Sequence, residues 1–289
     1  MGLGCTGRRL SVAIPASLVS DTPHLREKTG KLGSIARASS IFGVTRIVIY
    51  ADDSSRNQET DIEMCMEILR FVETPQYLRK GMFRLSENLR YTGILSPLQT
   101  PPHDVPHSVS ESGVGDLREG LVVGRRGNSL LVDVGLDRAF ECLGTAPVGR
   151  RVTVRVTNLG KNPVGEITGD SEGGRVYWGY EVKRANSSLS KFIEEDQSDL
   201  VIGTSRYGSK IADVWSDLTS SIKNAGHTLV VFGSPKLGLT DILKQENKAP
   251  TAVFDYFVNT VPNQNVSTVR TEEAILISLG IFNLATSIY

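Results

Sequence analysis

A block of short β-type segments interrupts this chain and separates two stretches that alternate between strand and helix. The block contains the segments GLVVGRRGNSLLVDVGL, RAFECLG, RRVTVRVTNLG and PVGEITG, which are divided by Gly, Asn and Asp turns. About five short strands within roughly seventy residues are typical of a small closed barrel, and the OB fold is the obvious candidate. The chain therefore cannot form one uninterrupted α/β sheet.

The stretches on both sides of this block share one pattern. The apolar runs LSVAIPASL and RIVIYAD are typical of buried parallel strands, and a helical pattern follows each of them. Pro75 interrupts the second helical pattern. Strand and helix alternate again in DLVIGTSRYGSKI, TLVVFGSPKLGLT and TAVFDYFVNTVPN. This order predicts an α/β fold with a mostly parallel sheet.

We predict that the barrel is inserted into the α/β domain. The junction YTGILSPLQTPPHDVPHSVSESGVGDLREG is crowded with Pro, Ser, Gly and His, as domain boundaries often are. The predicted segments are the first part of the α/β domain at 1–95, the barrel at 96–180 and the second part at 181–289.

The charge balance limits how the chain can meet a nucleic acid. Lys+Arg and Asp+Glu both number 32, so the net charge is zero and any RNA contact must come from a local patch. In the barrel block the candidates are Arg125 and Arg126 at a hairpin tip, and Arg151 and Arg155 in an alternating strand. Two interpretations remain open for these arginines: a solvated barrel face, or contact with single-stranded RNA.

Metal sites, disulfides and membrane segments are not expected. The three cysteines, Cys5, Cys65 and Cys142, are scattered and form no CxxC pair, which favours a reducing cytoplasm. His103 and His107 lie in Pro-rich sequence and indicate a linker. The N-terminal MGLGCT matches a myristoylation pattern, but a predicted strand follows at once, so we expect no lipid. No apolar run is long enough to span a membrane, and no secretory signal is expected.

Three loops of small and polar residues follow three successive predicted strands, at 201–209, 230–239 and 257–273. Ligands of parallel sheets bind at the carboxyl ends of strands, so we expect these loops to share one rim and one ligand. In the middle loop, Gly233 and Gly238 have the spacing of a phosphate-binding loop. Leu239 stands where that motif needs lysine, and Pro235 removes an N–H donor, so a nucleotide hydrolase is a poor alternative.

The motifs GTS…G, FGSP…GL and especially NTVPNQxxxTVRTEEA resemble the SPOUT class of RNA methyltransferases. Within that class, the split α/β domain with an OB-like insertion resembles an archaeal and eukaryotic family that includes a human centromere-associated member. The resemblance covers nearly the whole chain. It implies a trefoil knot near the C-terminus, an obligate homodimer with composite sites, and S-adenosylmethionine (AdoMet) bent in the knot.

The resemblance also implies which residues hold AdoMet, mostly through main-chain atoms. Phe232 and Val261 would sandwich the adenine, and Leu239 would line its pocket. For Glu272 and Glu273 we prefer helix capping, with Thr271 as the N-cap, to a catalytic role. The implied cofactor residues are Gly203, Thr204, Ser205, Phe232, Gly233, Ser234, Gly238, Leu239, Asn259, Thr260, Val261, Gln264 and Thr268.

Methyl transfer from a sulfonium needs alignment more than acid–base groups. Arg206, Asn259 and Arg270 are the candidates for steering a proton, and Arg8 and Arg9 for reaching RNA in a partner subunit's site. We therefore predict an AdoMet-dependent RNA methyltransferase that modifies a base of ribosomal RNA, with uridine as the candidate base. The alternative is a catalytically silent RNA-binding assembly factor that retains the AdoMet pocket.

Overall fold

A computed structural model describes residues 8–103, 112–168 and 176–287. The chain divides into two compact units. The barrel unit comprises Glu73–Glu87 and Pro97–Trp178, and the sheet unit comprises Gly7–Val72, Asn88–Ser96 and Gly179–Tyr289. Glu73–Glu87, which the sequence prediction gave to the α/β part, belongs with the barrel because helix α3 (Gln76–Met82) packs on strand β3 and Tyr77 donates to the Glu119 carbonyl at 2.9 Å.

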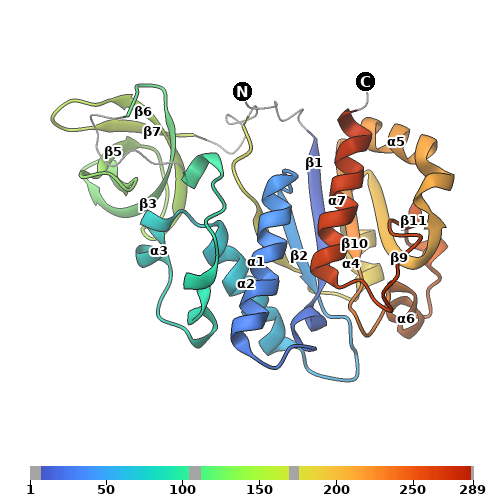
Figure 1. Cartoon of the computed structure of the whole chain (residues 1–289). Helices are drawn as coiled ribbons and strands as arrows, with labels where there is room; N and C mark the ends of the chain where they lie inside the picture. The colour runs from blue at the N-terminus through green and yellow to red at the C-terminus, as the bar shows by residue number, and fades with distance from the viewer. Residues whose placement is uncertain (1–7, 104–111, 169–175, 288–289) are drawn as a thin grey trace. The chain divides into compact units, whose positions relative to one another are not determined.

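The sheet unit is built on six strands in the order β11-β9-β10-β1-β2-β8 (Figure 1). Every neighbouring pair is parallel, which confirms the predicted mostly parallel sheet. β1 and β10 lie in the centre and are almost wholly buried, as apolar runs of parallel sheets are. The bounds are β1 Arg9–Pro15, β2 Arg46–Tyr50, β8 Glu181–Arg184, β9 Leu200–Lys210, β10 His227–Phe232 and β11 Tyr256–Asn259.

Helices follow the strands, as the alternating pattern predicts. The C-terminal helix α7 lies between α1 and α5 and contacts both (Figure 1). Helices α4 and α6 contact each other and share an apolar core with β2, β9 and β10. Helix α2 ends before Pro75, where the sequence predicted an interruption. The bounds are α1 Leu25–Ile41, α2 Glu59–Glu73, α4 Leu189–Glu195, α5 Trp215–Asn224, α6 Leu239–Gln245 and α7 Thr271–Ser287.

The five β-type segments of the central block close into a barrel with the order β3-β4-β5-β7-β6. β5 and β7 are parallel, and the other neighbours are antiparallel. Phe140 and Cys142 are fully buried in its core. Gly127 has φ +57° in the tight turn between β3 and β4, a conformation that favours glycine. The bounds are β3 Leu117–Arg126, β4 Ser129–Asp133, β5 Phe140–Leu143, β6 Arg151–Asn158 and β7 Val164–Thr168.

β9 does not end where the sequence predicted a loop. It continues to Lys210, and its register with β11 jumps from the pair Gly203–Phe257 to the pair Ser209–Val258. The residues between these pairs, 204–208, form a wide bulge at the sheet edge. A Cβ atom at Gly208 would lie 2.6 Å from the main chain of Val258, so only glycine lets the bulge return so close to β11.

A buried polar cluster lies at the amino ends of the central strands. His227 Nε2 lies 2.8 Å from Ser11 Oγ, the Arg46 guanidinium donates to Ser11 Oγ at 3.1 Å, and Arg46 pairs with Asp196 at 2.7 Å. His227 is 5% exposed. Burial lowers the pKa of His227, and the neighbouring Arg46 lowers it further.

This cluster predicts a loss of stability in mild acid. Because the folded state holds the pKa of His227 below its ordinary value of 6.5, the unfolded chain takes up the proton first as the pH falls. The contribution of neutral His227 to the free energy of unfolding is therefore fully present above its ordinary pKa, and it declines as the pH falls below that value. Urea midpoints at about pH 7.5 and about pH 5.5 should differ more for the native chain than for His227→Gln. Equal differences would contradict the prediction.

Candidate functional site

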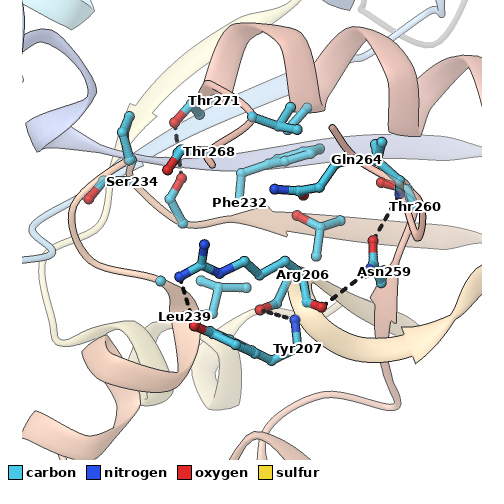
Figure 2. A pocket seen from close by; sticks show the side chains of 18 of the residues that line it. Arg206, Tyr207, Phe232, Ser234, Leu239, Asn259, Thr260, Gln264, Thr268 and Thr271 are labelled. Carbon is cyan, nitrogen blue, oxygen red and sulfur yellow. Dashed lines mark hydrogen bonds between the residues drawn. The ribbon is translucent and has the colours of Figure 1, made fainter. Parts of the chain in front are cut away.

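Three segments at the carboxyl ends of β9, β10 and β11 surround an open cavity of about 160 Å³ (Figure 2). The expectation that the three loops share one rim is confirmed, because these strands are neighbours in the sheet. The β9 bulge contributes Thr204 and Ser205 to the lining, and the end of β10 with its loop contributes Phe232, Gly233, Ser234, Gly238 and Leu239. The segment after β11 contributes Asn259, Thr260, Val261, Gln264 and Thr268.

Gly203 is the one implied cofactor residue that does not line this cavity. A Cβ atom there would lie 2.6 to 2.8 Å from the ring of Phe254, which belongs to the apolar core beneath the sheet. The missing side chain makes room for Phe254 and not for a ligand. The absence of a side chain at Gly203 is thus explained by packing, and a main-chain contact of Gly203 with AdoMet stays a prediction.

Asn259 ties two walls of the cavity together. Its Nδ2 donates to the Arg206 carbonyl at 2.9 Å, and its Oδ1 accepts the Val261 N–H at 2.9 Å. Both ends of the side chain are engaged, so Asn259 positions the walls and is not free to steer a proton. Figure 2 shows the bond from Asn259 to the Arg206 carbonyl, which joins the end of β11 to the β9 bulge.

Arg206 and Tyr207 form a stacked pair on the β9 bulge. The Arg206 guanidinium carbon lies 4.7 Å from the Tyr207 ring centroid, and Nη2 donates to the Tyr207 hydroxyl at 2.7 Å. Nη1 donates to the Ser267 carbonyl at 2.8 Å. Two chain segments thus hold the guanidinium at the cavity edge without any ligand. Arg206 keeps its place as a candidate reacting-site residue.

The loop after β10 is fixed by main-chain and hydroxyl bonds. Ser234 N–H donates to the Leu237 carbonyl at 2.9 Å, and the Leu237 N–H donates to Ser234 Oγ at 3.0 Å. The Tyr50 hydroxyl donates to the Phe232 carbonyl at 2.6 Å, and burial raises the pKa of Tyr50 so that it remains a donor. The apolar Phe232 and Leu239 are 1% and 0% exposed. This loop therefore places main-chain polar atoms at the cavity, and the apolar side chains of Phe232 and Leu239 are buried behind them.

Thr271 was predicted to cap α7, but its hydroxyl donates to the Gly233 carbonyl at 3.0 Å. It joins α7 to the loop after β10. Glu273 Oε2 accepts the Arg270 N–H at 2.9 Å, which agrees with helix capping for this glutamate. The Arg270 side chain lines a separate hollow with Asp21, Glu27 and Lys31 and does not line the cavity.

Sequence reasoning missed two charged residues of the lining, Lys236 and Asp241. Lys236 lies inside the glycine loop, and not at position 239, where a phosphate-binding loop would have its lysine. Asp241 lies in the first turn of α6, so it is brought to the cavity by the same loop. The position of an acid just after the glycine loop is the signal that could have identified it.

The candidate RNA-binding arginines lie in different surroundings. Arg126 has 69% of its side chain exposed and pairs with Glu141 at 2.7 Å, and Arg125 reaches the Ala146 carbonyl at 3.5 Å. Arg155 is partly buried on β6. Arg151 lies between Glu73 and Glu119 at 2.5 Å from each, so its charge is already matched inside the barrel unit. Arg151 is a poor candidate for RNA contact, because its guanidinium is already bonded to two carboxylates. The alternating sequence pattern predicts a half-exposed strand but gives no sign of these carboxylates.

Arg8 and Arg9 are exposed at the amino end of β1. The cavity lies at the carboxyl ends of the strands, so neither arginine reaches the cavity of its own chain. Among the described residues there is no group of His, Cys, Asp and Glu that could hold a metal ion. In the same described part of the chain, no helix is both long and apolar enough to cross a membrane. MGLGCT with Cys5, and His107, lie outside the described residues.

Comparison with known proteins places the chain in a family. Residues 9–282 match the family described as "Putative RNA methyltransferase". The human 28S rRNA (uridine-N(3))-methyltransferase is 34% identical over 94% of this chain and 77% of its own length, and the mouse protein of that name is 33% identical over 94% and 75%. An uncharacterised protein of Haloarcula marismortui is 34% identical over 95% and 98%. The chain therefore belongs to this family of RNA methyltransferases.

Proposed function

We propose that this protein transfers a methyl group from AdoMet to N3 of a uridine in ribosomal RNA. The observation that carries the proposal is the cavity at the ends of β9, β10 and β11, which gathers every implied cofactor residue except Gly203. The mammalian relatives are named for uridine-N3 methylation of 28S rRNA, and they align with most of this chain.

The residues present fit AdoMet better than a triphosphate. Val261 offers apolar surface for the adenine, and the loop after β10 offers main-chain donors and acceptors. Phe232 and Leu239 are 1% and 0% exposed, so they support the lining from below and the predicted sandwich of the adenine by Phe232 finds no exposed ring. The charged residues of the lining are Arg206, Lys236 and Asp241, so the cavity carries both signs of charge. Bound AdoMet would supply an activated methyl group.

Methylation at N3 replaces the N3 proton, so the chain has to orient the base and accept or direct that proton. The positive charge of Arg206 at the cavity edge would favour the negative charge that grows on the uracil ring. Among the described lining residues Asp241 is the carboxylate, and we take it as the candidate proton acceptor. Asn259 holds Arg206 through the main chain.

The finer architecture is also part of the proposal. The chain leaves β11 at the sheet edge, passes the β9 bulge, where Arg206 bonds to Ser267, and reaches α7 beside β10. This path is compatible with the SPOUT-type trefoil knot that the sequence resemblance implies. The closed five-stranded barrel with one parallel pair, β5 and β7, supports an OB-like insertion.

A homodimer is supported by α7. Its buried face packs on α1 and α5, yet apolar side chains also cover its outer face. Leu276, Ile277 and Leu284 are 48%, 37% and 53% exposed, at helical spacing. A helix that is apolar on all sides is expected to pack against other protein on all sides. A second copy of this chain would pack on the exposed apolar face of α7. Sedimentation of the purified protein tests this.

Two measurements test the function in order. Calorimetry should detect AdoMet binding without Mg²⁺, whereas a nucleotide hydrolase would bind ATP with Mg²⁺. Ribosomal RNA from cells lacking the gene should then gain N3-methyluridine when it is incubated with protein and AdoMet. AdoMet binding without any transfer would favour the silent assembly factor, and no AdoMet binding would refute the enzyme.

Neutralising the hairpin tip should weaken RNA binding. We expect Arg125→Gln with Arg126→Gln to lower RNA affinity and to reduce its dependence on salt, because each phosphate contact releases counterions. AdoMet affinity should remain that of the native protein. The matched control is Arg138→Gln, a 56% exposed arginine in the turn between β4 and β5. An unchanged salt dependence in the double variant would exclude this tip from the RNA surface.

A further inference from the structure

Tyr207 is an aromatic side chain exposed at the edge of the cavity. It is 68% exposed, and it is the one aromatic residue among the large apolar side chains that stand exposed in the described part of the chain. It also lines the cavity. A tyrosine so exposed contributes little to the core, so its position calls for a ligand.

The ring is held in place before any ligand arrives. Arg206 covers one face and donates to the hydroxyl at 2.7 Å, and the Tyr207 N–H donates to Ser205 Oγ at 3.2 Å. Arg206 is itself anchored on Ser267 at 2.8 Å. With one face covered and most of the side chain exposed, the second face is available. Figure 2 shows the guanidinium lying over the ring at the side of the cavity.

A fixed, exposed ring beside a cavity fits a flat ligand. Proteins recognise unpaired RNA bases by stacking them on aromatic rings, and enzymes that modify a base turn it out of its stack into a pocket. Two bonds of the Arg206 guanidinium, to the Tyr207 hydroxyl and to the Ser267 carbonyl, fix the covered side of the ring. The stacked pair thus offers one fixed aromatic face to a flat ligand.

We infer that Tyr207 is the stacking platform for the target base, which lies on its free face with its edge toward the cavity. The inference rests on the proposed function and adds the surface that holds the substrate. Tyr207 contacts the substrate base, and Arg206 positions the ring from behind. The Tyr207 side chain bonds to Arg206 and not directly to the loops after β10 and β11, so we expect AdoMet binding to tolerate its replacement.

The test compares Tyr207→Leu with Tyr207→Phe in methyl transfer to ribosomal RNA. Leucine keeps apolar volume but removes the π face, so KM for RNA should rise about 5- to 150-fold. Phenylalanine keeps the face, and KM should stay within about 3-fold. Calorimetry should give native AdoMet affinity for both variants. The matched control is Tyr91→Leu, because Arg90 lies 5.6 Å from the Tyr91 ring centroid in a similar pair that does not line the cavity.

A native KM in Tyr207→Leu would overturn the inference and leave the proposed function intact. If Tyr207→Leu changes the sedimentation coefficient of the protein but not its KM for RNA, the inference is also overturned. The ring would then be covered by a second copy of the chain. If the native protein transfers no methyl group, photocrosslinking tests whether a base contacts Tyr207. The probe is ribosomal RNA transcribed with 4-thiouridine in place of uridine. A crosslink to the peptide that carries Tyr207, lost in Tyr207→Leu, supports the platform, and no crosslink there overturns it.

Discussion

Replacing Gly233 by valine is expected to weaken AdoMet binding by about 10²-fold while the protein remains folded. A Cβ atom at Gly233 would lie 3.0 Å from the Leu239 nitrogen and 3.2 Å from Gly238 Cα and the Leu237 carbonyl oxygen. These are main-chain atoms of the loop that lines the cavity, so the loop has to move. The expected loss follows from main-chain bonds to the ligand that can no longer form.

The measurement is calorimetric titration with AdoMet, with thermal unfolding as the check on folding. Gly233→Ala should show a smaller loss, since alanine adds only the first carbon. Gly30→Ala is the matched control, because no atom lies within 4 Å of the added carbon on α1. If Gly233→Val binds AdoMet like the native chain, the loop after β10 does not hold the cofactor.

Gly233 and Gly203 illustrate what spacing can and cannot predict. Their positions after two apolar strands indicated the rim of the sheet, because strand ends are encoded locally. The direction in which each absent side chain would point depends on atoms far along the chain. At Gly203 that direction meets Phe254, and at Gly233 it meets the loop itself. The sequence therefore placed both glycines at the rim. Only the fold shows that Gly203 makes room for a core side chain and that Gly233 makes room for its own loop.

The parallel sheet could be predicted because apolar runs and helical periodicity are local signals. The β9 bulge could not, since it depends on the pairing of Ser209 with Val258 across the sheet edge. Tyr207 is placed at the cavity by that bulge. Asp241 and Lys236 were missed for a related reason, because a loop's path decides which of its charges face inward.

Arg151 shows the same limit in the barrel unit. The alternation of RRVTVRV predicts a half-buried strand, and β6 has that burial pattern. Alternation does not predict what lies opposite the outward side chains. Glu73 comes from the end of α2, far away in sequence, and Glu119 comes from β3. A residue predicted to meet RNA is instead surrounded by its own chain's carboxylates.

Replacing Arg151 by methionine is expected to destabilise the barrel unit by about 3 kcal/mol. Arg151 donates to Glu73 at 2.5 and 3.0 Å and to Glu119 at 2.5 Å, and the two carboxylates are 9% and 4% exposed. Burial opposes the charge of Arg151, but the attraction of Glu73 outweighs it, so the pKa of Arg151 is raised. Burial raises the pKa of Glu73 even with the guanidinium in place. Without Arg151, both carboxylates would be buried without the cation that bonds to them, and Glu119 would keep the neutral donors Thr153 and Trp178.

The indole of Trp178 provides the measurement, because its Nε1 donates to Glu119. In a Trp215→Phe background, urea unfolding followed by Trp178 fluorescence reports on the barrel unit. Arg151→Met should lower the midpoint strongly, and adding Glu73→Gln and Glu119→Gln should recover much of the loss, because no buried charge then lacks a partner. A native midpoint in Arg151→Met would contradict this account. Equal loss in the single and triple variants would show that shape, and not charge, makes Arg151 necessary.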